Sequence, residues 1–89
     1  MLIISQNQMR IVEMTGVVLD AVESDNGYKI VARTATDIVM LGKYPGERRA
    51  KEVLLDIAGK YNEYHQVNNS VSGVQGIFVV PKVYEMPIK

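Results

Sequence analysis

The sequence predicts an α+β fold, in which a curled antiparallel sheet of five to six strands carries one long helix across one face. Only the stretch from Pro45 to Tyr64 has the apolar spacing of an amphipathic helix. The remaining apolar runs are short and are separated by turn residues, which favours strands joined by tight turns and therefore antiparallel pairing. The chain has 89 residues, which suffices for one domain, 1–89, with one core.

The strands before the helix are predicted from short apolar runs rich in valine and isoleucine. Polar or glycine-containing turns separate them, and Thr15-Gly16 interrupts the pattern between the second and the third. The predicted strands are Met1 to Ser5, Met9 to Met14, Val17 to Glu23, Tyr28 to Thr34 and Ile38 to Leu41.

The Asn26-Gly27 turn sets the register of the central hairpin. A two-residue loop would place Glu23 opposite Ile30. A three-residue loop with a left-handed glycine would instead place Glu23 opposite Lys29 and Val22 opposite Ile30. The second register pairs opposite charges and pairs apolar with apolar residues. Each such pair stabilises a sheet by roughly a few tenths of a kcal/mol, and we expect this register for that reason.

The helix is predicted from Pro45 to Tyr64. Pro45 suits the first helical position, and Glu47 favours the positive end of the helix dipole. The apolar residues recur at intervals of one and three, so they share one face of the helix. That face consists of Ala50, Val53, Leu54, Ile57, Ala58, Tyr61 and Tyr64.

The chain changes character after the helix. Residues His65 to Gly76 are mostly polar, which predicts a mobile loop over 65–76. Ile77 to Val80 is an apolar strand, and Lys82 to Met86 is a short edge strand, because proline ends or borders each run. The predicted core is Ile3, Val12, Val22, Ile30, Met40, Val53, Leu54, Ile57, Tyr61 and Phe78.

Composition excludes several classes of function. Ten basic side chains balance ten acidic ones, which argues against a surface that tracks nucleic-acid phosphates as the main function. The chain has no cysteine and His65 is its single histidine, so no thiolate or histidine metal cluster can form. No nucleophile has an evident base. We therefore expect no enzyme activity, no cofactor and no metal.

No run of apolar residues reaches membrane-spanning length. The apolar opening, residues 2–4, is too short for a signal peptide and has no basic region before it. We therefore expect a cytoplasmic protein with no membrane partner.

Three parts of the chain carry a resemblance. They are Met1 to Gln6, the strand-to-helix segment Leu41 to Tyr44 with Arg49 to Leu54, and Tyr84 to Pro87. Together they resemble a group of short uncharacterised proteins from phages, prophages and genomes of Gram-positive bacteria. The resemblance covers both ends and the helix, and it implies a phage or mobile-element accessory protein that acts inside a bacterial cell. It carries over no catalytic or binding residue.

One set of helix residues is a candidate partner-binding site: Arg48, Leu55, Gly59 and Asn62. They share a face beside the apolar stripe. A glycine inside a helix costs about 1 kcal/mol relative to alanine, so Gly59 requires a reason. Either Gly59 begins the end of the helix, or the gap beside Leu55 lets another chain approach closely. That chain would be a host protein or a second copy in a homodimer.

A second set of helix residues is basic: Arg48, Arg49, Lys51 and Lys60. It is the candidate nucleic-acid-binding site, and its signature would be an affinity that falls steeply with salt. Our main hypothesis is a non-catalytic protein-interaction module, with inhibition of a host defence protein as one form in the phage setting. The alternative is a nucleic-acid-binding accessory protein that uses this basic helix start.

Overall fold

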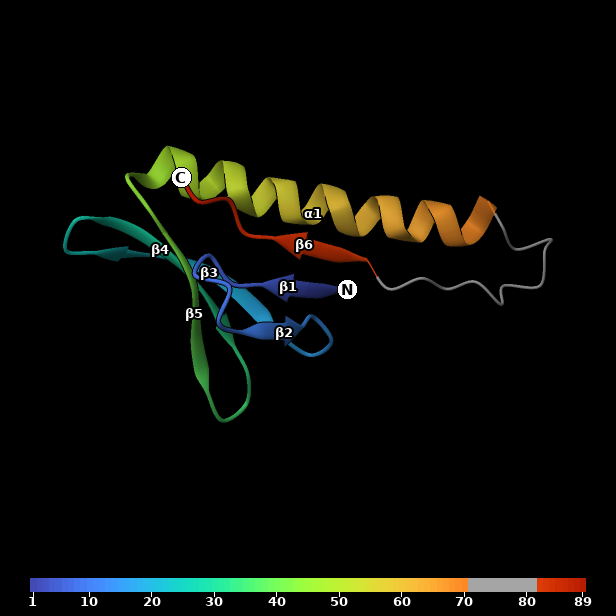
Figure 1. Cartoon of the computed structure of the whole chain (residues 1–89), viewed down its shortest axis with the longest axis horizontal. Coiled ribbons are helices and arrows are strands. Elements are labelled where there is room, and N and C mark those ends of the chain that lie inside the picture. The colour runs from blue at the N-terminus through green and yellow to red at the C-terminus, as the bar shows by residue number, and fades with distance from the viewer. Residues whose placement is uncertain (71–81) are drawn as a thin grey trace.

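The computed structural model describes residues 1–70 and 82–89. The fold is α+β, as predicted, and the helix α1 runs along the strands (Figure 1). The first sheet has the order β2-β1-β6 and the second the order β3-β4-β5. The elements are β1 (Leu2–Ile4), β2 (Ile11–Glu13), β3 (Val18–Ser24), β4 (Gly27–Arg33), β5 (Ile38–Tyr44), α1 (Glu47–Ser70) and β6 (Val83–Glu85).

The predicted single curled sheet is wrong, because the described strands form two three-stranded sheets. The chain turns sharply between β2 and β3, where Gly16 has a φ of 72° and the Val17 amide donates to the Met14 carbonyl over 3.2 Å. This turn directs β3 away from β2, so the two strands do not pair. Residues Thr15-Gly16 therefore separate two sheets.

The last strand adds a parallel pair to the first sheet. β6 lies beside β1, with Ile3 opposite Tyr84. Two flanking backbone hydrogen bonds continue the ladder, from the Leu2 amide to the Lys82 carbonyl over 2.9 Å and from the Met86 amide to the Ile4 carbonyl over 3.0 Å. The predicted edge strand at Lys82 to Met86 is thus confirmed, at the edge of the β2-β1-β6 sheet.

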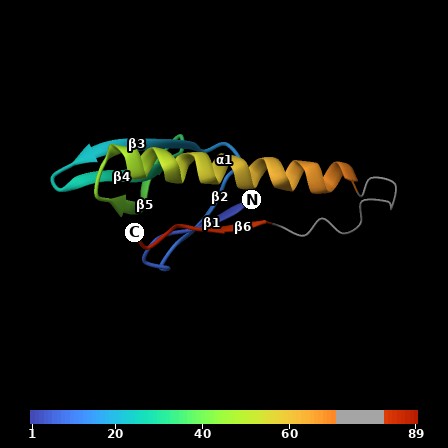
Figure 2. The ribbon, with the colours of Figure 1, turned by 90° about the horizontal axis from the view of Figure 1, so that it is seen from above.

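Both sheets and the helix share one core. Seen from above, β3 lies on one side of α1, and β1 and β6 lie on the other (Figure 2). Four of the predicted core residues are fully buried, and Val12 and Leu54 pack partly buried against them. The buried cluster is Ile3, Ile30, Ala32, Leu41, Tyr44, Ala50, Val53, Ile57 and Met86.

Three predicted core residues are exposed: Val22, Met40 and Tyr61. Val22 and Met40 lie on the sheet face that is turned away from the core, as described below. Tyr61 lies one turn beyond Ile57, which is the last fully buried position among helix residues 47–62. Phe78 lies outside the described residues.

The helix α1 is longer than predicted. It begins at Glu47, and its backbone remains helical to Ser70. Residues 65–70, predicted as the start of a loop, are therefore helical. Residues 60–70 contain neither glycine nor proline, so nothing in the backbone chemistry ends the helix at Tyr64. The remainder of that loop, 71–76, and the strand at 77–80 lie outside the described residues.

The register of the β3–β4 hairpin differs from both predicted registers. Ser24 pairs with Gly27, so Asp25 and Asn26 form the two-residue turn. Ala21, and not Val22, then lies opposite Ile30. A Cβ atom on Gly27 would collide with the Tyr44 carbonyl oxygen and would lie 3.0 Å from the Pro45 carbonyl oxygen. The close approach of β5 therefore fixes Gly27 as the first paired residue of β4.

This geometry predicts that Gly27→Ala destabilises the protein. Gly27 has a φ of 147°, which L side chains rarely adopt, and its missing Cβ makes room for the end of β5. We expect a loss of unfolding free energy of about 1–3 kcal/mol, the usual cost of a strained backbone position. The control is Gly46→Ala, because nothing lies within 4 Å of a Cβ built at Gly46. Urea titrations that gave equal stability for both variants would contradict this prediction.

Candidate interaction surfaces

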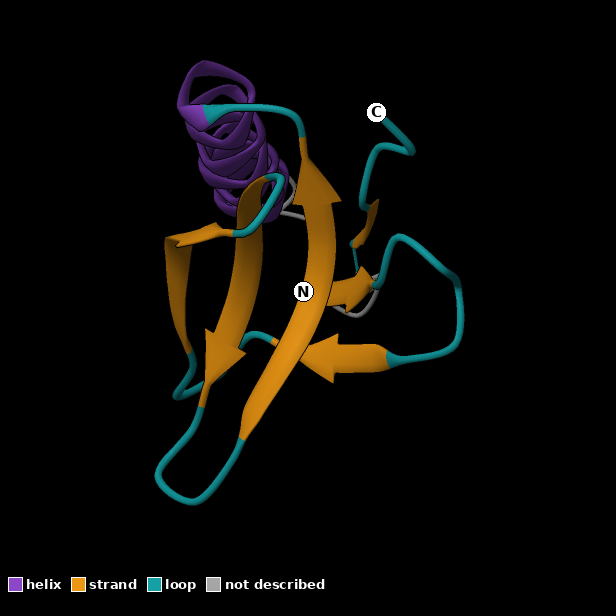
Figure 3. Ribbon diagram, turned by 90° about the vertical axis from the view of Figure 1, so that its left-hand side faces the viewer, coloured by secondary structure: helices purple, strands orange, loops and turns teal. Residues whose placement is uncertain are grey.

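Within the part of the chain that the structure describes, the core packs against one face of the β3-β4-β5 sheet and leaves residues on the other face exposed. Figure 3 shows its three strands side by side, with the helix at their upper ends. Strand side chains alternate between faces, so the register assigns each one. The inner face, which packs on the core, carries Leu19, Ala21, Tyr28, Ile30, Ala32, Val39 and Tyr44.

The outer face of this sheet carries exposed apolar side chains. We call this surface the open face: Val18, Asp20, Val22 and Ser24 of β3, Lys29, Val31 and Arg33 of β4, and Ile38, Met40 and Lys43 of β5. Its four large exposed apolar residues are Val18 (57% exposed), Val22 (36%), Ile38 (64%) and Met40 (52%). Apolar side chains so grouped typically mark a surface that another molecule covers.

The centre of the open face is already dry. Val31 is only 4% exposed, with Asp20 and Met40 directly opposite it on the two flanking strands. Beside it, Arg33 and Asp20 form an ion pair with 2.8 Å between Nη2 and Oδ2. The face therefore combines exposed apolar side chains with a charge pair that is satisfied within the chain.

The sequence pattern did not predict this surface, because it assigned Val22 and Met40 to the core. Val22 is opposite Lys29 on the open face, as a consequence of the two-residue turn. In β5 the ladder skips one residue, so that Ile30 pairs with Gly42 and Val31 with Met40. This irregularity turns Leu41 inward, where it is 1% exposed, and leaves Met40 outside.

The predicted partner-binding residues of the helix lie together on its solvent side. Arg48, Leu55, Gly59 and Asn62 are all exposed. At 3.6 residues per turn they fall within an arc of roughly 60°, opposite the buried positions. They were predicted to lie beside the apolar stripe, but they lie on the opposite side of the helix from its buried residues. Leu55, 72% exposed, is the one large apolar side chain among them.

Gly59 is an interior residue of α1 and does not end the helix. Nothing within the described structure lies within 4 Å of a Cβ built there. The suggestion that Gly59 begins the helix end is therefore wrong, and no close approach within the described chain explains it. Approach by another molecule stays a prediction.

The predicted basic site is divided by its own contacts. Arg49 turns toward the C-terminal segment, and Lys51 forms an ion pair with Glu47 over 3.1 Å. In the part of the chain that the structure describes, no ion pair involves Arg48 or Lys60. The four cations therefore do not present one uncompensated surface.

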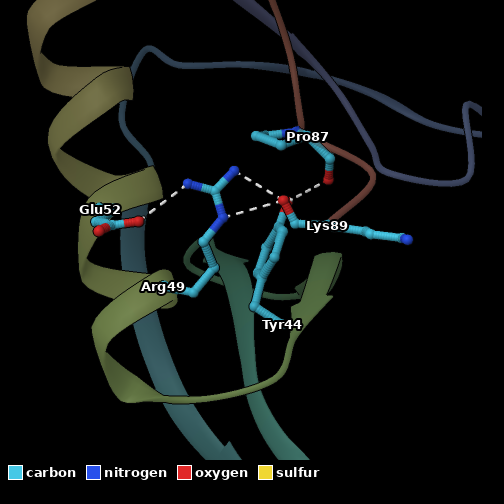
Figure 4. Close-up of polar contacts among 5 residues, drawn as sticks. All are labelled: Tyr44, Arg49, Glu52, Pro87 and Lys89. Carbon is cyan, nitrogen blue, oxygen red and sulfur yellow. Dashed lines mark hydrogen bonds and ion pairs between the residues drawn. The ribbon is translucent and has the colours of Figure 1, made fainter.

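We call residues 86–89, which follow β6, the C-terminal segment. Side chains from α1 and β5 hold this segment in a clamp of hydrogen bonds (Figure 4). The Tyr44 hydroxyl donates to the Pro87 carbonyl over 2.8 Å. Arg49 donates to the Lys89 carbonyl oxygen from Nε (3.0 Å) and Nη2 (2.7 Å), and its Nη1 contacts Glu52 at 3.2 Å. These contacts give Arg49 a structural role.

Gln6 completes this clamp from the N-terminal side. Its Nε2 donates to the carbonyl oxygens of Lys43 (3.0 Å), Pro87 (3.1 Å) and Ile88 (2.7 Å). Its Oε1 accepts a hydrogen bond from the Lys43 amide over 2.8 Å, and its own amide donates to the Leu41 carbonyl. One glutamine thus joins the β1–β2 turn, the edge of β5 and the C-terminal segment.

In the part of the chain that the structure describes, whose described side chains are those of residues 1–62 and 82–89, no group of three or more His, Asp or Glu side chains is placed to hold a metal ion. No helix in that part of the chain is long and apolar enough to cross a membrane. Comparisons of the chain with protein-family models, with curated proteins and with solved structures find no match. Any function must therefore be argued from the surfaces described above.

The clamp predicts a loss of stability at alkaline pH. Burial raises the pKa of Tyr44 to about 12 from its ordinary value of 10.0, and burial also raises the pKa of Tyr84. The folded state thus retains the phenol proton better than the unfolded state, so stability is fully present below pH 10 and falls as the pH rises toward 12. Urea unfolding at stepped pH measures this fall.

The control for the alkaline fall is Tyr44→Phe, which has no titrating group at this position. We expect a lower baseline stability, because the hydrogen bond to Pro87 is lost, and a shallower fall above pH 10. Tyr84 accounts for the part of the fall that persists. An identical pH slope in the parent and in Tyr44→Phe would contradict this role of Tyr44.

Proposed function

We propose that this protein is a non-catalytic interaction module that binds another protein through the open face. The observation that carries the proposal is the set of four exposed apolar side chains around the dry Val31. Covering them would remove apolar area from water, which is the main driving force of protein association. The internal Asp20–Arg33 ion pair adds a fixed polar feature that a partner can recognise.

The open face supports binding better than the solvent side of α1. Among the described side chains on that side of the helix, Leu55 is the one large apolar residue, and isolated exposed leucines are common on protein surfaces. The open face presents four such side chains on the two outer strands, β3 and β5, of one sheet. The nucleic-acid alternative has less support, because Arg49 and Lys51 are engaged within the chain.

The resemblance to phage and prophage proteins suggests the class of partner. In that setting the partner is a protein of the bacterial host, and occupation of its surface by a small module without catalytic groups would inhibit it. A host defence protein is the target that this reasoning favours. The proposal commits to a different protein as the occupant of the open face, and a second copy of this chain is an outcome that the test distinguishes.

The experiment compares three variants in binding to a host protein. The tagged parent captures candidates from a Gram-positive lysate, and each candidate is then purified and titrated against Ile38→Glu, Met40→Glu and Leu55→Glu. We expect both open-face variants to weaken the same partner by about 30-fold or more, as truncation of an interface hot spot does. Leu55→Glu, on the far side of the helix, should bind as the parent does.

Two results would overturn this assignment. Loss of binding in Leu55→Glu alone would place the interface on the helix residues Arg48, Leu55, Gly59 and Asn62. A concentration-dependent dimer in sedimentation equilibrium, abolished by Met40→Glu, would identify a second copy as the occupant. Circular dichroism of each variant confirms that a lost interaction does not reflect a lost fold.

A further inference from the structure

One end of the open face carries two lysines that lie directly opposite each other. Lys29 of β4 and Lys43 of β5 are paired residues in the antiparallel ladder. Their side chains therefore leave the sheet on the same face, beside each other. Like charges in this position destabilise a sheet. Neither lysine belongs to an ion pair among the described residues.

A shallow hollow of about 420 Å³ lies at this lysine pair. Its lining residues are Glu23, Ser24, Asp25, Lys29, Met40 and Lys43. The Ser24 hydroxyl is buried and has no hydrogen-bond partner in the described structure. A buried hydroxyl without a partner costs free energy, so Ser24 is a second feature of this hollow that the chain itself leaves unsatisfied.

The acidic residues of the hollow, Glu23 and Asp25, differ in their position relative to the lysines. Glu23 lies opposite Tyr28, so strand alternation assigns its side chain to the inner face, away from Lys29 and Lys43. Asp25 is in the two-residue turn and is the one carboxylate left beside the pair. The hollow therefore has two lysines and two carboxylates in its lining, and the register places both lysines together on its open-face side.

We propose that this hollow binds a phosphate group between Lys29 and Lys43, and that the Ser24 hydroxyl, which is shielded from solvent in this structure, turns toward the phosphate as a third donor. A phosphate monoester carries nearly two negative charges at neutral pH, which matches two lysines, and its three terminal oxygens match three donors. A carboxylate offers one charge and two oxygens and fits less well. The hollow lies within the open face, but the phosphate proposal rests on the lysine pair and Ser24 and not on the four exposed apolar side chains that carry the proposed protein partner.

The first experiment measures phosphate binding by amide chemical shifts. The parent is titrated with inorganic phosphate and separately with O-phosphoserine, at constant ionic strength, and with acetate as the carboxylate arm. We expect saturable shifts at residues 23–29 and 40–43 with both phosphate compounds and weaker effects with acetate. Inorganic phosphate alone would indicate a free-anion site, and a preference for O-phosphoserine would indicate a phosphorylated ligand.

Variants then test which groups hold the phosphate. Lys29→Gln and Lys43→Gln should each weaken phosphate binding about tenfold or more, since each removes a charged donor. Ser24→Ala should weaken it less. Asp25→Asn should strengthen it, because it removes the competing carboxylate. The matched control is Lys82→Gln. It removes one positive charge at the residue that precedes β6, outside the hollow, and should leave the affinity unchanged.

A stability readout separates this site from general surface electrostatics. In phosphate-free buffer of low salt, Lys43→Gln should raise the melting temperature, because it relieves the repulsion from Lys29. It should also abolish the rise in melting temperature that phosphate gives the parent. Phosphate shifts spread over the whole chain, or Lys82→Gln weakening binding as much as Lys43→Gln, would overturn the proposal. Loss of the protein partner in Ile38→Glu, whose site lies outside the hollow, with phosphate binding intact would support two distinct sites.

Discussion

The surface chemistry of the second sheet depends on the pairing of Ser24 with Gly27. A shift of one residue in a hairpin moves every side chain to the opposite face. Here the register places Ala21 opposite Ile30 in the core and Val22 opposite Lys29 outside. It is fixed by the approach of the Tyr44 carbonyl to Gly27, where no side chain fits. The exposure of Val22 follows from this contact, whereas the irregularity in the β4–β5 ladder turns Met40 outward.

A second constraint joins the two sheets to the helix. Gln6, Tyr44 and Arg49 all donate hydrogen bonds to carbonyl oxygens of the C-terminal segment, and Met86 of that segment is 4% exposed in the core. These contacts join residues that are about forty or eighty positions apart in sequence. They also explain why the basic start of α1 is not a free cationic surface, because Arg49 is turned toward the chain's own backbone.

Local patterns in the sequence predicted the α+β class, the existence of every described strand and the presence of the helix, although its predicted start at Pro45 was two residues too early. They predicted Ile3, Ile30, Val53 and Ile57 in the core because each lies in a regular apolar repeat. They failed for Val22 and Met40, since the faces of these residues depend on a turn and a ladder irregularity that only β5 packing decides. The open face was missed for the same reason, whereas the exposure of Leu55 and Gly59 followed from helical periodicity alone.

The central claim, that one face of the β3-β4-β5 sheet is uncovered, is tested most directly by methionine oxidation. Peroxide converts accessible methionines to sulfoxides, and mass spectrometry measures the rate at each position. Met40, 52% exposed on the open face, should react at a rate near that of Met9, which is 80% exposed. Met86, 4% exposed, should react far more slowly. Protection of Met40 equal to that of Met86 in the folded monomer would contradict the account.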